Sequence, residues 1–298
     1  MKKRWLLNLI LLAIVASLVT FLYVRPKTDV KQNLEHEIST YKLSEFNVIS
    51  VEFPAKAAVS YEKINGYWQI TAPYKTRADQ ASVQRILAIV AAKSTEKIVA
   101  DDLDKFGLNA PSLKLKLYRD KENVEEFLFG THSPLTDQQY VLHRNTVYLI
   151  DNIYAESAST QLIEMIDKSP LKPTEKVVGF DFARLEQWEA SSLNVDIIDG
   201  KWKVSIAEAA PDQNELNEWL DFSWLQNRAK SVELYKPDRK TVYPSFEVKL
   251  ADGSKVRFDK IQESPDLLLA RPDEGIIYTF PSDAGFVMLN PPINLPSK

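Results

Sequence analysis

Side chains suited to chemistry are scarce in this 298-residue chain, which has three histidines and no cysteine. His132 and His143 flank a predicted hairpin, with Asp137 between them. A hairpin can bring such residues together, and two imidazoles beside a carboxylate are a common set of zinc ligands. The alternative is that both histidines lie on a solvated strand face and bind nothing. We predict no metal, and keep His132 and His143 as candidates for a partner or ligand surface.

Acidic residues gather from 101 to 104, before Phe106 and Gly107. An EF-hand calcium loop that began at Asp102 would place Phe106 and Leu113 at two ligand positions, where apolar side chains cannot bind the ion. The cluster instead predicts a short helix, because a helix N-terminus favours negative charge. Gly107 would end that helix in the left-handed conformation.

Sequence patterns of catalytic centres are missing: the chain has no Gly-x-Ser-x-Gly elbow, no phosphate loop and no His-Glu-x-x-His. Neighbouring carboxylates such as Glu125 and Glu126 point to opposite faces of a strand, so they cannot share a proton. We therefore expect a protein that is not an enzyme and that needs no cofactor.

Two tryptophans are further candidates for a partner or ligand surface. Trp219 and Trp224 lie five residues apart. That spacing corresponds to about 140° around an α-helix, so both rings can hardly lie centrally on one buried stripe. In one interpretation a ring is exposed to a partner or a glycan. In the other, both rings fill a wide apolar face.

The elements that position these residues begin with a hydrophobic segment over 5–24, twenty residues without a charge. As a helix it is long enough to cross a membrane, and Trp5 and Tyr23 occupy the interfacial positions that aromatic rings favour. A cleaved signal peptide is the alternative, but bulky residues stand where a peptidase needs small ones. The basic cluster before the segment predicts a single-pass anchor with a cytoplasmic N-terminus and an extracytoplasmic bulk.

Net charge and cysteine content limit which cellular compartments and which classes of partner fit this protein. The first 27 residues carry five basic side chains and no acid, which leaves 32 basic and 41 acidic residues, a net charge of −9, in the rest. An acidic domain does not suit binding to phosphate backbones, so we expect no nucleic acid. A cysteine-free ectodomain fits a bacterial periplasm, and the expected location is the bacterial inner membrane.

Beyond a polar stalk over 26–43, predicted to be partly helical through 32–41, the sequence repeats itself with an offset of 130 to 134 residues. An Asn/Asp-Gly turn precedes a tryptophan strand in each copy, and an Asp that can cap a helix follows. An alternating strand and a later tyrosine strand complete each copy. The paired landmarks are Asn65-Gly66 with Asp199-Gly200, Asp79-Gln80 with Asp212-Gln213, Pro111–Leu117 with Pro244–Leu250, and Tyr148 with Tyr278.

These landmarks predict an α+β fold: one N-terminal transmembrane helix followed by two homologous, mainly antiparallel sheet-plus-helix repeats. The expected divisions are a cytoplasmic tip and anchor over 1–25, the stalk over 26–43, a first repeat over 44–168, a proline-rich joint over 169–175, and a second repeat with a tail over 176–298.

Residues 66–150 resemble the bacterial family known as domain of unknown function 4340. Order and spacing carry the resemblance, through Trp68-Gln-Ile70, Pro73, Arg77-Ala78-Asp79, Phe106-Gly107-Leu108, Pro111, Gly130, Tyr140-Val141 and Val147-Tyr148-Leu149. The second repeat departs from the pattern, with Ala210 where the first has Arg77. The resemblance implies no catalytic residues. It does imply an association with ABC-type membrane transporters, including those tied to gliding motility.

The sequence thus predicts a non-catalytic, membrane-anchored periplasmic accessory or scaffold protein. Its expected partners are inner-membrane lipid and subunits of an ABC-type transporter. The alternative is a periplasmic ligand-binding or hydrolytic module, with a cleft between the two repeats at the joint, since domain interfaces favour pockets.

Overall fold

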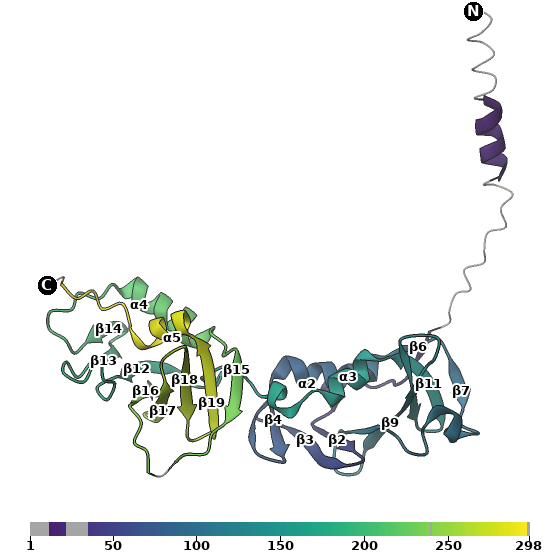
Figure 1. The fold of residues 1–298 in the computed structure, drawn as a ribbon, viewed down its shortest axis with the longest axis horizontal. Coiled ribbons are helices and arrows are strands. Elements are labelled where there is room, and N and C mark those ends of the chain that lie inside the picture. Colours follow the sequence, from purple (N-terminus) through teal and green to yellow (C-terminus); the bar gives the residue numbers. More distant parts are fainter. Residues whose placement is uncertain (1–11, 22–34, 239, 297–298) are drawn as a thin grey trace, which may run out of the picture.

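The computed structural model describes residues 12–21, 35–238 and 240–296, which form an α+β protein with mainly antiparallel sheets (Figure 1). The first sheet contains nine strands: β2 (Val48–Phe53), β3 (Lys56–Ile64), β4 (Tyr67–Ala72), β5 (Thr76–Arg77), β7 (Lys97–Val99), β8 (Leu113–Tyr118), β9 (Val124–His132), β10 (Gln138–His143) and β11 (Thr146–Asp151). The second contains eight: β12 (Val177–Asp181), β13 (Asn194–Ile198), β14 (Lys201–Val204), β15 (Ser231–Leu234), β16 (Ser245–Leu250), β17 (Lys255–Gln262), β18 (Asp266–Arg271) and β19 (Ile276–Pro281).

The two sheets have the same strand order, apart from the extra edge strand β5 in the first. The first runs β5-β4-β3-β2-β8-β9-β10-β11-β7 and the second β14-β13-β12-β16-β17-β18-β19-β15. In each, a three-stranded meander precedes a four-stranded one, and their first strands pair antiparallel in the middle of the sheet. We call the part of the chain around the first sheet the first unit, and the part around the second sheet the second unit.

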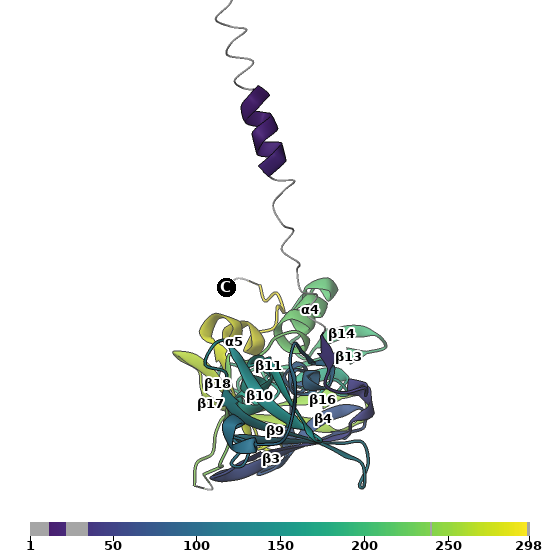
Figure 2. The same cartoon turned by 90° about the vertical axis from the view of Figure 1, so that its right-hand side faces the viewer.

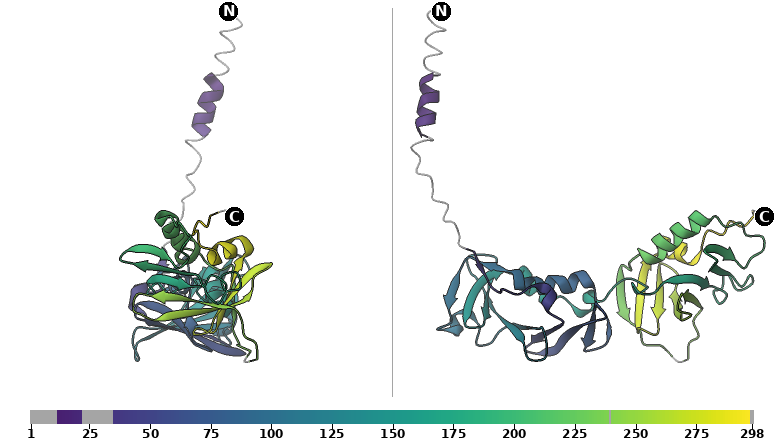
Figure 3. Two further views of the ribbon diagram at one scale, coloured as in Figure 1. Left: turned by 90° about the vertical axis from the view of Figure 1, so that its left-hand side faces the viewer. Right: turned by 180° about the vertical axis from the view of Figure 1, so that it is seen from behind.

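Helices lie on one face of each sheet, as Figures 2 and 3 show from two directions. They are α2 (Gln80–Leu87) and α3 (Ile153–Ser159) in the first unit, and α4 (Gln213–Trp219) and α5 (Ser282–Leu289) in the second. Short turns of other helix types complete the set: η1 (Leu43–Glu45), η2 (Ala88–Ala91), η3 (Leu103–Phe106), η4 (Leu162–Met165) and the π-helical η5 (Leu220–Leu225). The closing helices α3 and α5 were not predicted, because each is too short for a clear apolar period.

The predicted hairpin turns are confirmed. Asn65 and Gly66 have φ of 52° and 86°, and Asp199 and Gly200 have φ of 52° and 74°. Positive φ at both central residues is the geometry of the turn that matches strand twist. Each turn therefore delivers a tryptophan-bearing strand, β4 or β14, to its sheet.

A glutamine holds that tryptophan strand in both units. Gln80 accepts a hydrogen bond from the Trp68 backbone N–H at 2.8 Å and donates one to its carbonyl at 3.0 Å. Gln213 makes the same two bonds with Trp202, at 2.7 and 3.1 Å. Each glutamine follows an aspartate that caps its helix, Asp79 for α2 and Asp212 for α4, as predicted. The side chain thus fixes the angle between helix and sheet.

The acidic segment before Gly107 forms the short helix η3, and Gly107 ends it with φ of 66°. Gly130 lies against the same turn, where an added Cβ would come within 2.0 Å of the Phe106 carbonyl oxygen. Both glycines are thus required by close backbone approach rather than by a ligand.

The predicted stalk ends earlier than expected, and its predicted helix is wrong over residues 35–41. His36–Glu37 form β1, which pairs with β6 (Lys93–Ser94), and Ile38 is buried. An apolar side chain that can reach the core outweighs helix propensity in so short a segment. Residues 26–34 lie outside the described residues.

The predicted membrane span falls only partly within the described residues. Residues 12–21 are helical and exposed, whereas Trp5 and Tyr23 lie outside the described part. Among the residues that the structure describes, no helix is long and apolar enough to cross a membrane.

We predict that the glutamine contact is a local requirement of the fold. Gln80→Ala leaves the Trp68 backbone N–H and carbonyl without these partners, so the free energy of unfolding should fall by about 1–3 kcal/mol. Urea titration of the full chain measures the change. Gln84→Ala, on the exposed side of the same helix, is the matched control and should change stability by less than about 0.5 kcal/mol. Equal losses in the two variants would contradict the assignment.

Candidate functional site

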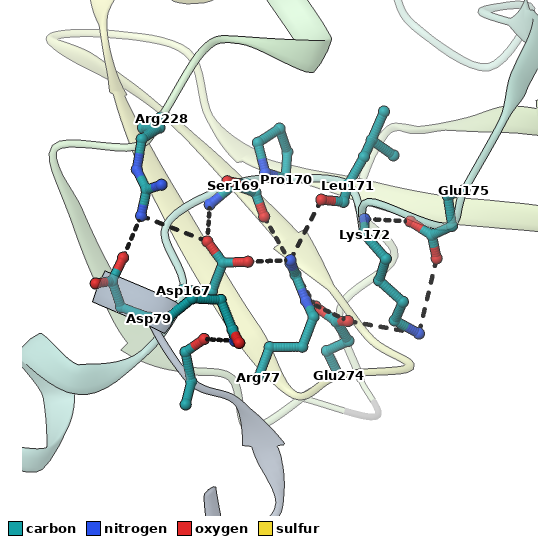
Figure 4. A network of polar contacts seen from close by, with 12 residues as sticks. Arg77, Asp79, Asp167, Ser169, Pro170, Leu171, Lys172, Glu175, Arg228 and Glu274 are labelled. Atoms are coloured by element: carbon teal, nitrogen blue, oxygen red, sulfur yellow. Dashed lines mark hydrogen bonds and ion pairs between the residues drawn. The ribbon is translucent and has the colours of Figure 1, made fainter. Parts of the chain in front are cut away.

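The most heavily bonded polar side chain of the described structure is Arg77, at the joint between the two units (Figure 4). Its side chain is only 11% exposed. Nε and Nη2 donate to the Glu274 carboxylate of the second unit at 2.9 and 3.1 Å, and Nη1 donates to Asp167 at 2.6 Å. Further bonds reach the carbonyls of Ser169 and Leu171. One guanidinium therefore fastens the first unit, the joint and the second unit together.

A second buried arginine completes the joint from the other side. Arg271, at the end of β18, has a fully buried side chain. It donates to both oxygens of Glu175 and of Asp273, and to the Pro170 carbonyl at 2.8 Å. Arginines from both sheets thus hold the chain between the units. Each of them donates hydrogen bonds to backbone carbonyls of the joint.

The capping aspartate of α2 also joins this network. Asp79 accepts a bond from the Ser82 backbone N–H at 2.8 Å, and Arg228 of the second unit donates to its other oxygen at 2.5 Å. Arg228 also lies 3.5 Å from Asp167. A residue predicted only as a helix cap therefore contacts the second unit as well.

Electrostatics keep the network ionised. Burial acts against the charged form of Arg77, but the acidic groups of Tyr278, Glu274 and Asp167 outweigh it and raise the pKa of the guanidinium. Burial likewise opposes ionisation of Glu175 and Asp79. Hydrogen bonds from Arg271 in the first case, and from Ser82 and Arg228 in the second, outweigh burial and lower the pKa of each carboxyl.

A cavity of about 360 Å³ opens beside the network. Both units and the joint line it, among them Tyr67, Gln69, Lys172, Asp273 and Glu274. Its position agrees with the cleft of the alternative prediction, although no histidine lines it. Glu274 is bonded to Arg77 and Tyr278, and Lys172 lies 3.5 Å from Glu274, so these charged groups are already partnered.

The two histidines do not come together. His132 pairs with Gln139 and His143 with Phe127, at different points of the β9–β10 ladder. His132 is exposed, whereas His143 is buried, stacks on Phe127 and lies 3.2 Å from the Glu125 carboxylate. Burial lowers the pKa of His143. Among the described residues no group of three or more potential ligands could hold a metal ion.

The tryptophan pair lies in the core, so neither ring forms a surface of its own. Trp219 is 4% exposed and Trp224 is fully buried against Phe180, Phe246 and Phe258. The predicted angular conflict assumed a regular α-helix. In the π-helical turn η5 hydrogen bonds join residues five apart, which brings such a pair onto one face.

Sequence reasoning missed Arg77, Arg271 and Glu274 as a set, because they lie up to 197 residues apart. One signal was available: the second repeat has Ala210 in place of Arg77. In the first repeat this position makes the bond to the other unit, whereas the alanine of the second repeat has no group that could make one.

Comparison with known proteins gives one match. The model of the family described as Domain of unknown function (DUF4340) matches residues 68–240. More than half of the chain is covered, so the protein belongs to this family. No curated protein and no solved structure gives a match.

We predict that Arg77 sets the rigidity of the joint. Arg77→Ala removes the hydrogen-bonded cation of Glu274 and Asp167, which keep only longer contacts with other basic side chains. The loss of stability should therefore approach, but not exceed, the cost of about 3–5 kcal/mol for a buried charge that loses its partner. Arg77→Lys keeps the charge but loses the planar fork and should restore only part of that loss. Urea unfolding of the full chain measures the cost, and small-angle scattering measures the spread of inter-unit distances. The control is the exposed Arg184→Ala. If Arg77→Ala matched this control in both measurements, the assigned role would be wrong.

The joint should also be sensitive to acid. Glu175, Asp79 and Asp273 each have a pKa that is lowered in the folded protein. Their contribution to stability is therefore complete above the unfolded pKa values and is lost as pH falls below about 4.5. Melting temperatures measured from pH 7 to pH 3 should fall in this window. In Glu175→Gln the fall should be smaller, and an unchanged acid dependence would contradict the linkage to Glu175.

Proposed function

We propose that this protein is a non-catalytic, membrane-anchored accessory or scaffold subunit on the periplasmic side of a bacterial inner membrane. The observation that carries the proposal is the buried Arg77–Glu274 bridge between the units. A binding protein that closes around a ligand needs a hinge whose contacts break and reform. Breaking this joint would leave buried charges without partners, which is costly. The two units therefore suit a protein that keeps one fixed arrangement.

The polar groups of the described structure support a non-catalytic role. The carboxylates at the joint are bonded to arginines, and His143 is held between Glu125 and the Glu126 carbonyl. A general base needs a free lone pair within reach of a substrate proton. The lone pairs of these groups are already used in structural hydrogen bonds.

The anchor is supported by the sequence of residues 5–24, with Trp5 and Tyr23 at the two interfaces. An N-terminus in the cytoplasm follows from the basic cluster at residues 2–4. Inner-membrane lipid is then one partner. The association with an ABC-type transporter rests on family resemblance.

We also infer that the two units are homologous and arose by duplication. Their common strand order and the glutamine contact at matching positions support this. Repeats over 44–168 and 176–298 fit these elements, with the joint over 169–175 between them.

A second candidate is the periplasmic ligand-binding or hydrolytic module. The cavity of about 360 Å³ between the units favours it. Such a module would be stabilised by its ligand, because anything that binds only the folded state raises its stability.

Affinity purification of the full chain from detergent-solubilised membranes tests the leading proposal. We expect membrane transporter subunits to be recovered with it, and fewer of them with Arg77→Ala, in which the units are no longer held. Arg184→Ala serves as the matched control. Recovery of the chain alone, together with a melting temperature raised by a periplasmic small-molecule extract, would contradict the scaffold role and favour the ligand-binding module.

A further inference from the structure

The helix face of the second unit exposes large apolar side chains. Phe222 in η5 is 63% exposed, and Phe286 and Val287 in α5 are 63% and 48% exposed. A shallow groove of about 300 Å³ lies between these helices, lined by Phe222 and Val287 and floored by Trp219. We call this the α4–α5 groove. Isolated exposed apolar side chains are ordinary on protein surfaces, but exposed ones on both walls of a groove are typical of an interaction site.

The fold does not require this surface, because the first unit builds the same elements without it. With the offset of 130 that relates Tyr148 to Tyr278, the counterparts of Phe286 and Val287 are Glu156 and Ser157. The counterpart of Phe222, at an offset of 133, is the buried Ile89. Moreover, α2 and α3 pack against each other, whereas α5 packs against η5. The groove and its apolar wall are thus specific to the second unit.

Charges around the groove define the chemistry of its occupant. Glu215 and Glu218 line the groove, and Asp221 directly precedes Phe222 in η5. All three are exposed, and none of them forms an ion pair within the described residues. The nearest basic side chains along the chain are already used, since Arg228 pairs with Asp79 and Lys230 with Asp266. An acidic rim repels anionic lipid headgroups and attracts a cationic partner.

The floor of the groove is preorganised. Trp219 donates from its ring N–H to the Val287 carbonyl at 2.7 Å, which ties α4 to α5. The ring itself is held among Phe180 and Phe182. A partner would therefore meet a rigid surface and would lose little entropy in ordering it.

We propose that the α4–α5 groove binds an amphipathic helix of a partner protein, one that carries lysines or arginines beside a stripe of large apolar side chains. Such a helix places its apolar face in a groove and its charges over the rim. The inference rests on the proposed accessory function and names the surface through which that function is exercised.

The test uses the full chain in nanodiscs of zwitterionic lipid, with empty nanodiscs as the blank. The probe is a labelled amphipathic peptide of leucine and lysine, about 18 residues long so that it can form a helix. A leucine–glutamate peptide of the same pattern is the charge control. We expect the lysine peptide to bind and the glutamate peptide not to bind. Phe222→Ser should weaken binding at least about tenfold, as loss of a buried aromatic anchor does. Val287→Ser, on the opposite wall of the groove, should also weaken it.

Charge variants test the rim. The double variant Glu218→Lys/Asp221→Lys should bind the lysine peptide with lower affinity and should now bind the glutamate peptide. Matched controls are Leu135→Ser, which removes a side chain 91% exposed in the first unit, and Glu156→Lys on α3. Neither control should change the affinity. Equal loss in groove and control variants, or groove-dependent binding of anionic vesicles in place of the peptide, would overturn the proposal.

Affinity purification separates this inference from the function it rests on. If transporter subunits are recovered equally with wild type and with Phe222→Ser, the accessory function stands and the groove assignment fails. If the peptide binds at the groove but no subunit is recovered with any variant, the groove assignment stands and the proposed function fails.

Discussion

A guanidinium buried between two sheets determines how this protein is put together. Arg77 belongs to the first unit, yet its charge is balanced by Glu274 of the second unit as well as by Asp167 at the end of its own. A buried cation without partners would be prohibitively costly, so the two units must lie where their carboxylates can reach it. Glu274, directly after β18, and the joint carbonyls meet this requirement from the second unit and from the connecting chain. The two units are therefore joined through shared charges.

The same strand order occurs in both units, so the differences between them indicate what each unit has to do. The first has Arg77, which bonds to the other sheet, where the second has Ala210, whose side chain cannot make such a bond. The second has Phe286 where the first has Glu156, and so turns an apolar surface outward. Conversely, the glutamine that holds the tryptophan strand is common to both, which marks it as a demand of the fold itself.

Much of the fold could be predicted because its signals are local. Asn65-Gly66 and Asp199-Gly200 specify their hairpins through backbone geometry, and Asp79 and Asp212 specify helix starts through side-chain bonds to the first turn. The closing helices α3 and α5 and the strand at His36 could not be predicted, because tertiary contacts determine whether such short elements form. The joint could not be predicted for a stronger reason. A charge network between residues 77 and 274 has no sequence period, and π-helical winding at Leu220–Leu225 changes which side chains share a face.

The arginines at the joint recognise its backbone more than its side chains. Arg77 binds the carbonyls of Ser169 and Leu171, and Arg271 binds that of Pro170. A carbonyl stands in nearly the same place whatever residue bears it, whereas an inserted or deleted residue would shift all three. The side chain at position 169 is therefore weakly constrained by these bonds, whereas the number of residues in the joint is strongly constrained. For this stretch of backbone, chain length matters more than the identity of the residue that bears each carbonyl.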